Sequence, residues 1–128
     1  MKARAMIGVM VAVLAGATSA SAAIHASTFS SGDANCGVTI GERQMGCFSP
    51  VLPASSLDGF IQLGPHGHAR LTERGDCPFR QRCKAGPKLR RGQDWERVGV
   101  KCHHGRGLRC ENKDAHGFVL RRHSYRRF

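Results

Sequence analysis

The sequence predicts an all-β fold, a small disulfide-stapled antiparallel β domain made of short hairpins. Three observations favour this class. Six cysteines occur as three pairs that are close in sequence, short apolar runs end at glycines and prolines, and no segment has helical apolar spacing for more than one or two turns. Cysteines at this density are typical of exported domains, in which disulfides persist.

An N-terminal signal peptide is predicted over residues 1–22. Lys2 and Arg4 give it a positive start, and residues 20–22 (Ala-Ser-Ala) fit the small-residue cleavage pattern. The apolar stretch between them is about a dozen residues long, short of the ~20 that cross a bilayer. A membrane anchor is the alternative. We expect cleavage to leave one secreted β domain over residues 23–128, extracellular or associated with the cell surface, without a transmembrane segment.

The first cysteine pair predicts a hairpin bridged by a disulfide between Cys36 and Cys47. If these cysteines face each other, the loop is Gly41-Glu42, and glycine suits the first loop position because a type II′ turn has a positive φ there. The same register separates an apolar face from a small or polar face, as in a half-buried hairpin. The apolar face holds Cys36, Val38, Ile40, Met45 and Cys47, and the other face holds Gly37, Thr39, Gln44 and Gly46.

A second hairpin is predicted by Cys102 and Cys110. When these cysteines face each other, the loop is 105–107, and its last residue, Gly107, is expected to be left-handed. The register also places Lys101 opposite Glu111, a favourable charge pair across strands. The inward face holds Val98, Val100, Cys102, His104, Leu108 and Cys110, whereas His103 points outward beside Arg109.

The two remaining cysteines, Cys77 and Cys83, pair by elimination. Six cysteines allow 15 pairings, so the complete pattern is an inference from spacing and turn chemistry. Zinc binding is the alternative for these cysteines, but the chain contains no C-x-x-C spacing.

The rest of the chain also predicts short strands between turns. Residues 60–63 and 68–72 fit an antiparallel pair, and a last strand begins at residues 118–120. Residues 51–58, with their prolines and paired serines, predict a loop. Residues 121–128 are charged and terminal, so we expect a frayed basic tail.

Positive charge is concentrated in the second half of the chain. Residues 70–128 contain 17 of the 20 basic residues and six of the nine acidic ones. This bias predicts contact with an anionic polymer, such as a wall phosphate polymer, a polysaccharide or a nucleic acid. A charged surface that only maintains solubility is the alternative. The candidate anion-binding residues are Arg90, Arg91, Arg121, Arg122, Arg126 and Arg127.

A nearly continuous series of glycines, cysteines and apolar residues resembles a family of small secreted proteins that is common in actinobacteria. The matching residues are Phe29-Ser30-Ser31-Gly32, Cys36, Leu63-Gly64-Pro65, Gly67, Ala69, Gly75-Asp76, Leu89, Gly92, Trp95, Cys102, Gly107, Cys110, Asn112, His116-Gly117-Phe118 and Leu120. The resemblance implies a secreted protein with paired-cysteine β-hairpins, but it implies no activity. The position of Cys77 and Cys83 and the high arginine content depart from the family pattern.

Seven histidines raise the question of a metal site. Cleavage after Ala22 would expose Ala23-Ile24-His25, whose amine, two amide nitrogens and imidazole can form the square-planar site that copper(II) and nickel(II) prefer. This spacing is common by chance. We therefore assign no metal ligand beyond the single candidate His25 and interpret the histidines as structural or surface residues.

Catalytic motifs are absent from the sequence. It lacks G-x-S-x-G, H-E-x-x-H and phosphate-loop patterns, so we assign no catalytic or cofactor-binding residue and expect a non-enzymatic secreted module without a cofactor. A structural or inhibitory protein-interaction module is one alternative. A secreted hydrolase such as a ribonuclease is another, and its candidate residues are His104, His116 and Lys101.

Overall fold

The structure is a computed structural model that describes residues 22–39, 41, 43–54, 59–73, 79 and 86–128. The predicted Cys77–Cys83 bridge and all but the last residue of the predicted signal peptide lie outside these residues. In the described part of the chain, no apolar helix of bilayer-crossing length is present.

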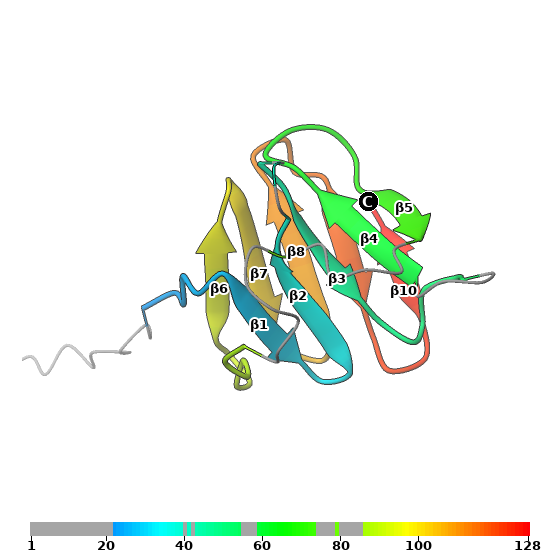
Figure 1. Cartoon of the computed structure of the whole chain (residues 1–128). Helices are drawn as coiled ribbons and strands as arrows, with labels where there is room; N and C mark the ends of the chain where they lie inside the picture. Colours follow the sequence, from blue (N-terminus) through cyan, green and yellow to red (C-terminus); the bar gives the residue numbers. More distant parts are fainter. Residues whose placement is uncertain (1–21, 40, 42, 55–58, 74–78, 80–85) are drawn as a thin grey trace, which may run out of the picture.

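Short strands form two antiparallel sheets in the described part of the chain, and the first sheet lies in front of the second in Figure 1. Each sheet is a meander, because strands that follow each other in sequence are also neighbours in the sheet. The first sheet contains β1 (Thr28–Ser31), β2 (Ala34–Val38), β3 (Met45–Phe48), β4 (Gly59–Leu63) and β5 (Arg70–Glu73). The second sheet contains β6 (Asp94–Arg97), β7 (Val100–His104), β8 (Leu108–Asn112), β9 (Gly117–Leu120) and β10 (Tyr125–Arg127). The all-β prediction is confirmed.

The predicted hairpin around Cys36 and Cys47 is confirmed. The two cysteines face each other in β2 and β3 and form a disulfide, with their Cα atoms 4.1 Å apart. Gly41 has a φ of 72°, as the predicted turn requires. Its neighbours Ile40 and Glu42 lie outside the described residues.

Both faces of this hairpin are buried, whereas the sequence predicted one exposed face. Gly37, Thr39 and Gly46 are buried because aromatic rings cover them. A Cβ atom on Gly46 would lie 2.1 Å from the ring of Phe60, and one on Gly37 would lie 2.8 Å from the ring of Phe79. The small residues therefore mark a place where rings pack directly on the backbone.

The second hairpin has the predicted disulfide and register but a different turn geometry. The facing pairs include Cys102 with Cys110, Lys101 with Glu111, and His103 with Arg109. The left-handed conformation predicted for Gly107 is wrong, since Gly107 is not among the glycines with positive φ. Glycine is needed there because a Cβ atom would lie 2.4 Å from the carbonyl oxygen of Leu120. Val98, predicted in the strand, instead occupies the turn before β7 with a φ of 51°.

A single hydrophobic cluster joins the two sheets. Phe29 in β1 faces Cys36, and Trp95 in β6 faces Cys102, so each aromatic residue holds the same place in its own meander. Their ring centroids are 4.7 Å apart, and both side chains are buried. The Trp95 indole also donates a hydrogen bond to the carbonyl oxygen of Ala26. This contact between sheets is the centre of the core.

The basic tail is an ordered strand, so the predicted fraying is wrong. Residues 125–127 form β10 and pair with β9. Phe128 exchanges two backbone hydrogen bonds with Gly117, and its ring lies 4.1 Å from the Arg109 guanidinium carbon. Terminal charge predicted a solvated tail, but an edge strand accommodates charged side chains because they remain exposed.

Candidate anion-binding site

Four loops meet at one end of the two sheets and enclose a pocket of about 370 Å³. The first sheet contributes the turn at residues 32–33 and the segment 49–51 that follows β3. The second sheet contributes the loop at residues 105–107 and residues 121–122 after β9. The site thus combines residues that are far apart in sequence, and it depends on how the sheets pack.

Ser31 and His104 form a hydrogen-bonded pair in this pocket. Each is the last residue of its strand, Ser31 in β1 and His104 in β7. The Ser31 hydroxyl oxygen is 2.5 Å from Nδ1 of His104. The His104 backbone is held by a hydrogen bond to the Gln93 carbonyl and another from the Gly92 amide. One hydrogen bond therefore holds the His104 imidazole, and two others hold its backbone.

The surroundings of His104 favour its neutral form. Burial lowers the pKa of the imidazole from its ordinary value, and the positive charges of His103, Lys88 and Arg91 lower that pKa further. The lowered pKa favours the uncharged imidazole at neutral pH more strongly than in a free histidine. The neutral imidazole can accept or donate a hydrogen bond there without contributing charge.

Guanidinium groups from two loops supply the positive charge of the pocket. Arg106 comes from the β7–β8 loop, and Arg121 and Arg122 come from the β9–β10 turn. All three side chains are exposed. Asp33 is the one acidic residue among the described residues that line the pocket. Arginines arranged in this way can bind phosphate, sulfate or carboxylate groups.

Lys88 and Arg91 extend this positive charge beyond the pocket. Both are exposed, and both are close enough to His104 to lower its pKa. Lys88 pairs with β1 through Ser30. We refer to Lys88, Arg91, Arg106, Arg121 and Arg122 together as the cationic end.

The six predicted anion-binding arginines are all exposed, but only two of them line the pocket. Arg121 and Arg122 line the pocket, and Arg90 is exposed beside Arg91 in the segment before β6. Arg126 and Arg127 belong to the edge strand β10, and Arg126 lines a second, smaller pocket together with Arg121. The guanidinium carbon of Arg126 lies 5.8 Å from the centre of the Phe128 ring.

Sequence reasoning missed Arg106, Lys88 and Ser31. Arg106 had a local signal, because it lies between two glycines in a loop whose position the disulfide register predicts. Lys88 and Ser31 had no such local signal. The sequence does not show that Lys88 pairs with β1 or that β1 of the first sheet approaches His104 of the second.

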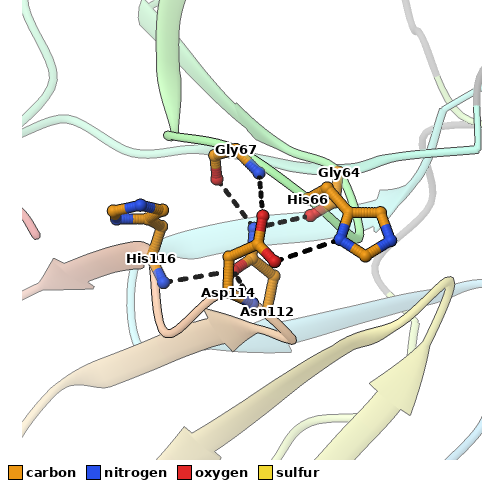
Figure 2. Close-up of polar contacts among 6 residues, drawn as sticks. All are labelled: Gly64, His66, Gly67, Asn112, Asp114 and His116. Carbon is orange, nitrogen blue, oxygen red and sulfur yellow. Dashed lines mark hydrogen bonds and ion pairs between the residues drawn. The ribbon is translucent and has the colours of Figure 1, made fainter.

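The opposite end of the molecule is closed by a network of hydrogen bonds around Asn112 (Figure 2). The buried Asn112 amide donates to the carbonyl oxygens of Gly64, at 3.1 Å, and Gly67, at 2.8 Å. The Asp114 carboxylate accepts a hydrogen bond from the Gly67 amide at 2.8 Å and contacts His66. The Gly67 bond, followed by the His66 contact, lowers the pKa of Asp114. This end links a loop of the first sheet to a loop of the second.

The residues considered for a ribonuclease are not brought together. His104 lines the pocket, whereas His116 lies at the Asn112 end, where its backbone amide donates to the Asn112 side chain. The four residue steps of β8 that separate these ends span about 13 Å. Lys101 is exposed, with its Nζ atom 3.5 Å from Asp94 Oδ2. No common reaction centre is available to these three side chains.

The predicted metal candidate His25 lies beside β6. Its Nδ1 atom is 2.7 Å from the carbonyl oxygen of Glu96, and the Ile24 amide donates to the carbonyl oxygen of Asp94. A square-planar site would have to break this second bond, because it uses the Ile24 amide nitrogen. Within the described residues, no group of three or more histidine, cysteine, aspartate or glutamate side chains has a metal-binding arrangement.

The predicted resemblance to secreted actinobacterial proteins stays a prediction. Four of the cysteines form two disulfides in the described part of the chain, and Trp95 lies in the core. Both features stabilise the fold and do not identify a family. A scan against models of protein families and searches of curated proteins and of solved structures find no match to this chain.

Proposed function

We propose that this protein is an exported, non-enzymatic module that binds an anionic polymer through its cationic end. The observation that carries this proposal is the position of the charge. Arg106, Arg121 and Arg122 line one pocket together with His104, and Lys88 and Arg91 are close enough to lower the pKa of His104. Charge that served only solubility would not need to gather around one pocket.

A polymeric ligand suits this site better than a single small anion. Each exposed ion pair contributes only about 0.2–1 kcal/mol, because water and salt screen it. A polymer contacts several cations at once and releases its bound counterions, so weak contacts sum to a useful affinity. Ser31 carries no charge and the surroundings of His104 favour its neutral form, so the arginines are the source of positive charge in the lining.

Export is the second part of the proposal. It is supported by the Cys36–Cys47 and Cys102–Cys110 disulfides, since such bridges persist mainly in oxidising compartments. The predicted signal peptide gives the same location. Detection of the mature chain in culture medium or at the cell surface, with residues 1–22 removed, would test this part directly.

The binding test compares two double variants that lose the same charge. Arg121→Gln/Arg122→Gln removes two cations from the pocket. Arg97→Gln/Lys113→Gln removes two cations at the opposite end, where Gly99 lies close to both Lys113 and Pro65. Retention on immobilised heparin and on poly(glycerol phosphate) is measured as a function of salt.

We expect the pocket variant to bind either polymer roughly tenfold more weakly, as expected for two lost contacts of up to about 1 kcal/mol each. Its salt dependence should also flatten by about one unit of slope per lost contact. The control should bind within about twofold of the original protein. Equal losses in both variants would show that only net charge matters, and a stoichiometric protein partner insensitive to salt would favour a protein-interaction module.

A second candidate function, hydrolysis, is supported by the hydrogen bond between Ser31 and His104. A serine hydroxyl beside a neutral imidazole is the first requirement of a nucleophilic site. A fluorophosphonate reagent would then label Ser31, and His104→Gln would abolish the labelling. Unlabelled Ser31 after prolonged exposure to the reagent would exclude this candidate.

A further inference from the structure

The residues that line the pocket favour one class of anionic polymer over the others. This further inference rests on the proposed function. We infer that the pocket seats the phosphodiester groups of a polyol phosphate chain, in which small aliphatic alcohols are joined through phosphates. The inference rests on three features: arginines on two separate loops, aliphatic side chains in the lining, and further cations near His104.

The cations approach the pocket from separate loops. Arg106 belongs to the β7–β8 loop, whereas Arg121 and Arg122 belong to the β9–β10 turn. One bidentate arginine can bind either a carboxylate or two phosphate oxygens. The two free oxygens of a phosphodiester lie on a tetrahedral centre, so they can accept further hydrogen bonds from a donor on a second loop. The Ser31–His104 pair offers polar atoms from the first sheet and from β7.

The apolar part of the lining is aliphatic. Its side chains come from both sheets, and no phenylalanine, tyrosine or tryptophan occurs among the described residues that line the pocket. Nucleobases bind single-strand-binding proteins by stacking on aromatic rings, and the one ring in this lining is the imidazole of His104, which is hydrogen-bonded to Ser31. The aliphatic residues of the lining are Ala34, Pro50, Val51, Leu108 and Leu120.

Positive charge continues beyond the residues that line the pocket. Lys88 forms a β-bridge with Ser30, next to the pocket residue Ser31, and Lys88 and Arg91 are close enough to His104 to lower its pKa. A chain with one negative charge on every repeat could therefore place one phosphate in the pocket and a neighbouring one near Lys88. A short aliphatic repeat between phosphates matches the aliphatic lining.

The experiment compares three anionic probes of matched total charge. The probes are a short glycerol phosphate chain, an oligothymidylate and a heparin fragment, and their dissociation constants are measured by calorimetry at one salt concentration. We expect the glycerol phosphate chain to bind at least about tenfold more tightly than the other two, since pocket contacts add to charge attraction only for this probe.

Two variants test whether the pocket provides this preference. Val51→Phe fills the pocket without changing charge, so it should remove the preference for glycerol phosphate and leave heparin affinity within about twofold. Asp33→Asn removes the acidic residue of the lining at an exposed turn, so it should strengthen glycerol phosphate binding about twofold to fivefold even if Val51→Phe does not fold.

The outcomes separate this inference from the proposed function. Equal affinity for the three probes, or no change in preference with either variant, overturns the inference and leaves binding driven by charge alone. A preference for oligothymidylate or heparin overturns it in favour of nucleic acid or sulfated polysaccharide. Failure of all three probes to bind overturns both the inference and the proposed function.

Discussion

His104 connects the pocket to the pH dependence of folding. Its pKa is lowered in the folded protein, first by burial and then by His103, Lys88 and Arg91. In the unfolded chain it protonates near its ordinary value of 6.5. Between these two values the unfolded chain binds more protons, so the free energy of unfolding falls as the pH falls. This part of the stability is complete above pH 6.5.

His104→Gln is therefore expected to reduce the loss of stability on acidification. The variant keeps an acceptor and a donor near Ser31 but removes the titrating group. Urea unfolding at pH 7.5 and pH 5.5 should show a smaller decrease in the free energy of unfolding for the variant than for the original protein. His25→Gln is the matched control, since His25 is exposed. An equal pH dependence in all three proteins would contradict the role assigned to His104.

At the scale of elements, β10 completes the second sheet. Tyr125 packs against the hydrophobic cluster, and β10 covers the edge of β9, in which Val119 and Leu120 are buried. Deleting residues 125–128 should lower the free energy of unfolding by about 2–4 kcal/mol. The deletion removes the packed side chains of Tyr125 and Phe128 and exposes the edge of β9. Urea unfolding monitored by circular dichroism measures this loss.

A variant without the tail charges serves as the control for this deletion. Arg126→Gln/Arg127→Gln keeps the strand and should remain within about 1 kcal/mol of the original stability. If the truncated chain were as stable as this double variant, β10 would contribute nothing to the fold, and the expectation of a frayed tail would be restored.

Elements with local signals were predictable from the sequence. Cysteine spacing and turn glycines gave both bridged hairpins, because facing residues in a hairpin have a fixed relation along the chain. β1 and β6 lacked such a signal. Each has four residues, too few for a clear alternation. Their equivalence is visible only in the spacing from Phe29 to Cys36 and from Trp95 to Cys102.

The pocket was not predictable, for a different reason. Its charged residues were recognised in part, with Arg121 and Arg122 among the candidates. Their grouping with Arg106 and Ser31 depends on which loops meet when two sheets stack, and no local pattern encodes that. The Cys102–Cys110 register could predict that His104 points inward, but it could not reveal Ser31 as its partner.

At the scale of the whole molecule, the two ends of the paired sheets differ in their residues and in the role we assign to them. One end brings together the cations around the pocket, and the other holds the sheets together through Asn112. The fold can tolerate repulsion among exposed arginines at one end because the core and the Asn112 network fix the sheets elsewhere. Binding and stability are thus separated in space, so charge variants at the pocket should report on binding.

The contact between Phe29 and Trp95 predicts that both sheets unfold together. Phe29→Ala should lower the free energy of unfolding by about 3–5 kcal/mol, as is usual for a buried phenylalanine. It should also change the native emission of Trp95, the single tryptophan of the chain, because the rings are 4.7 Å apart. Phe48→Ala is the control: Phe48 packs on Phe60 over the outer face of the first sheet, so Trp95 emission should not change.

Two measurements in urea decide whether unfolding is cooperative. Trp95 fluorescence reports on the second sheet, whereas far-ultraviolet circular dichroism reports on both sheets. Because one hydrophobic cluster contains residues of both sheets, the two transitions should coincide in the original protein and in Phe29→Ala. Transitions at different urea concentrations would mean that each meander folds by itself. The pocket between their loops would then form only when the sheets dock, and its ligand would stabilise that docked state.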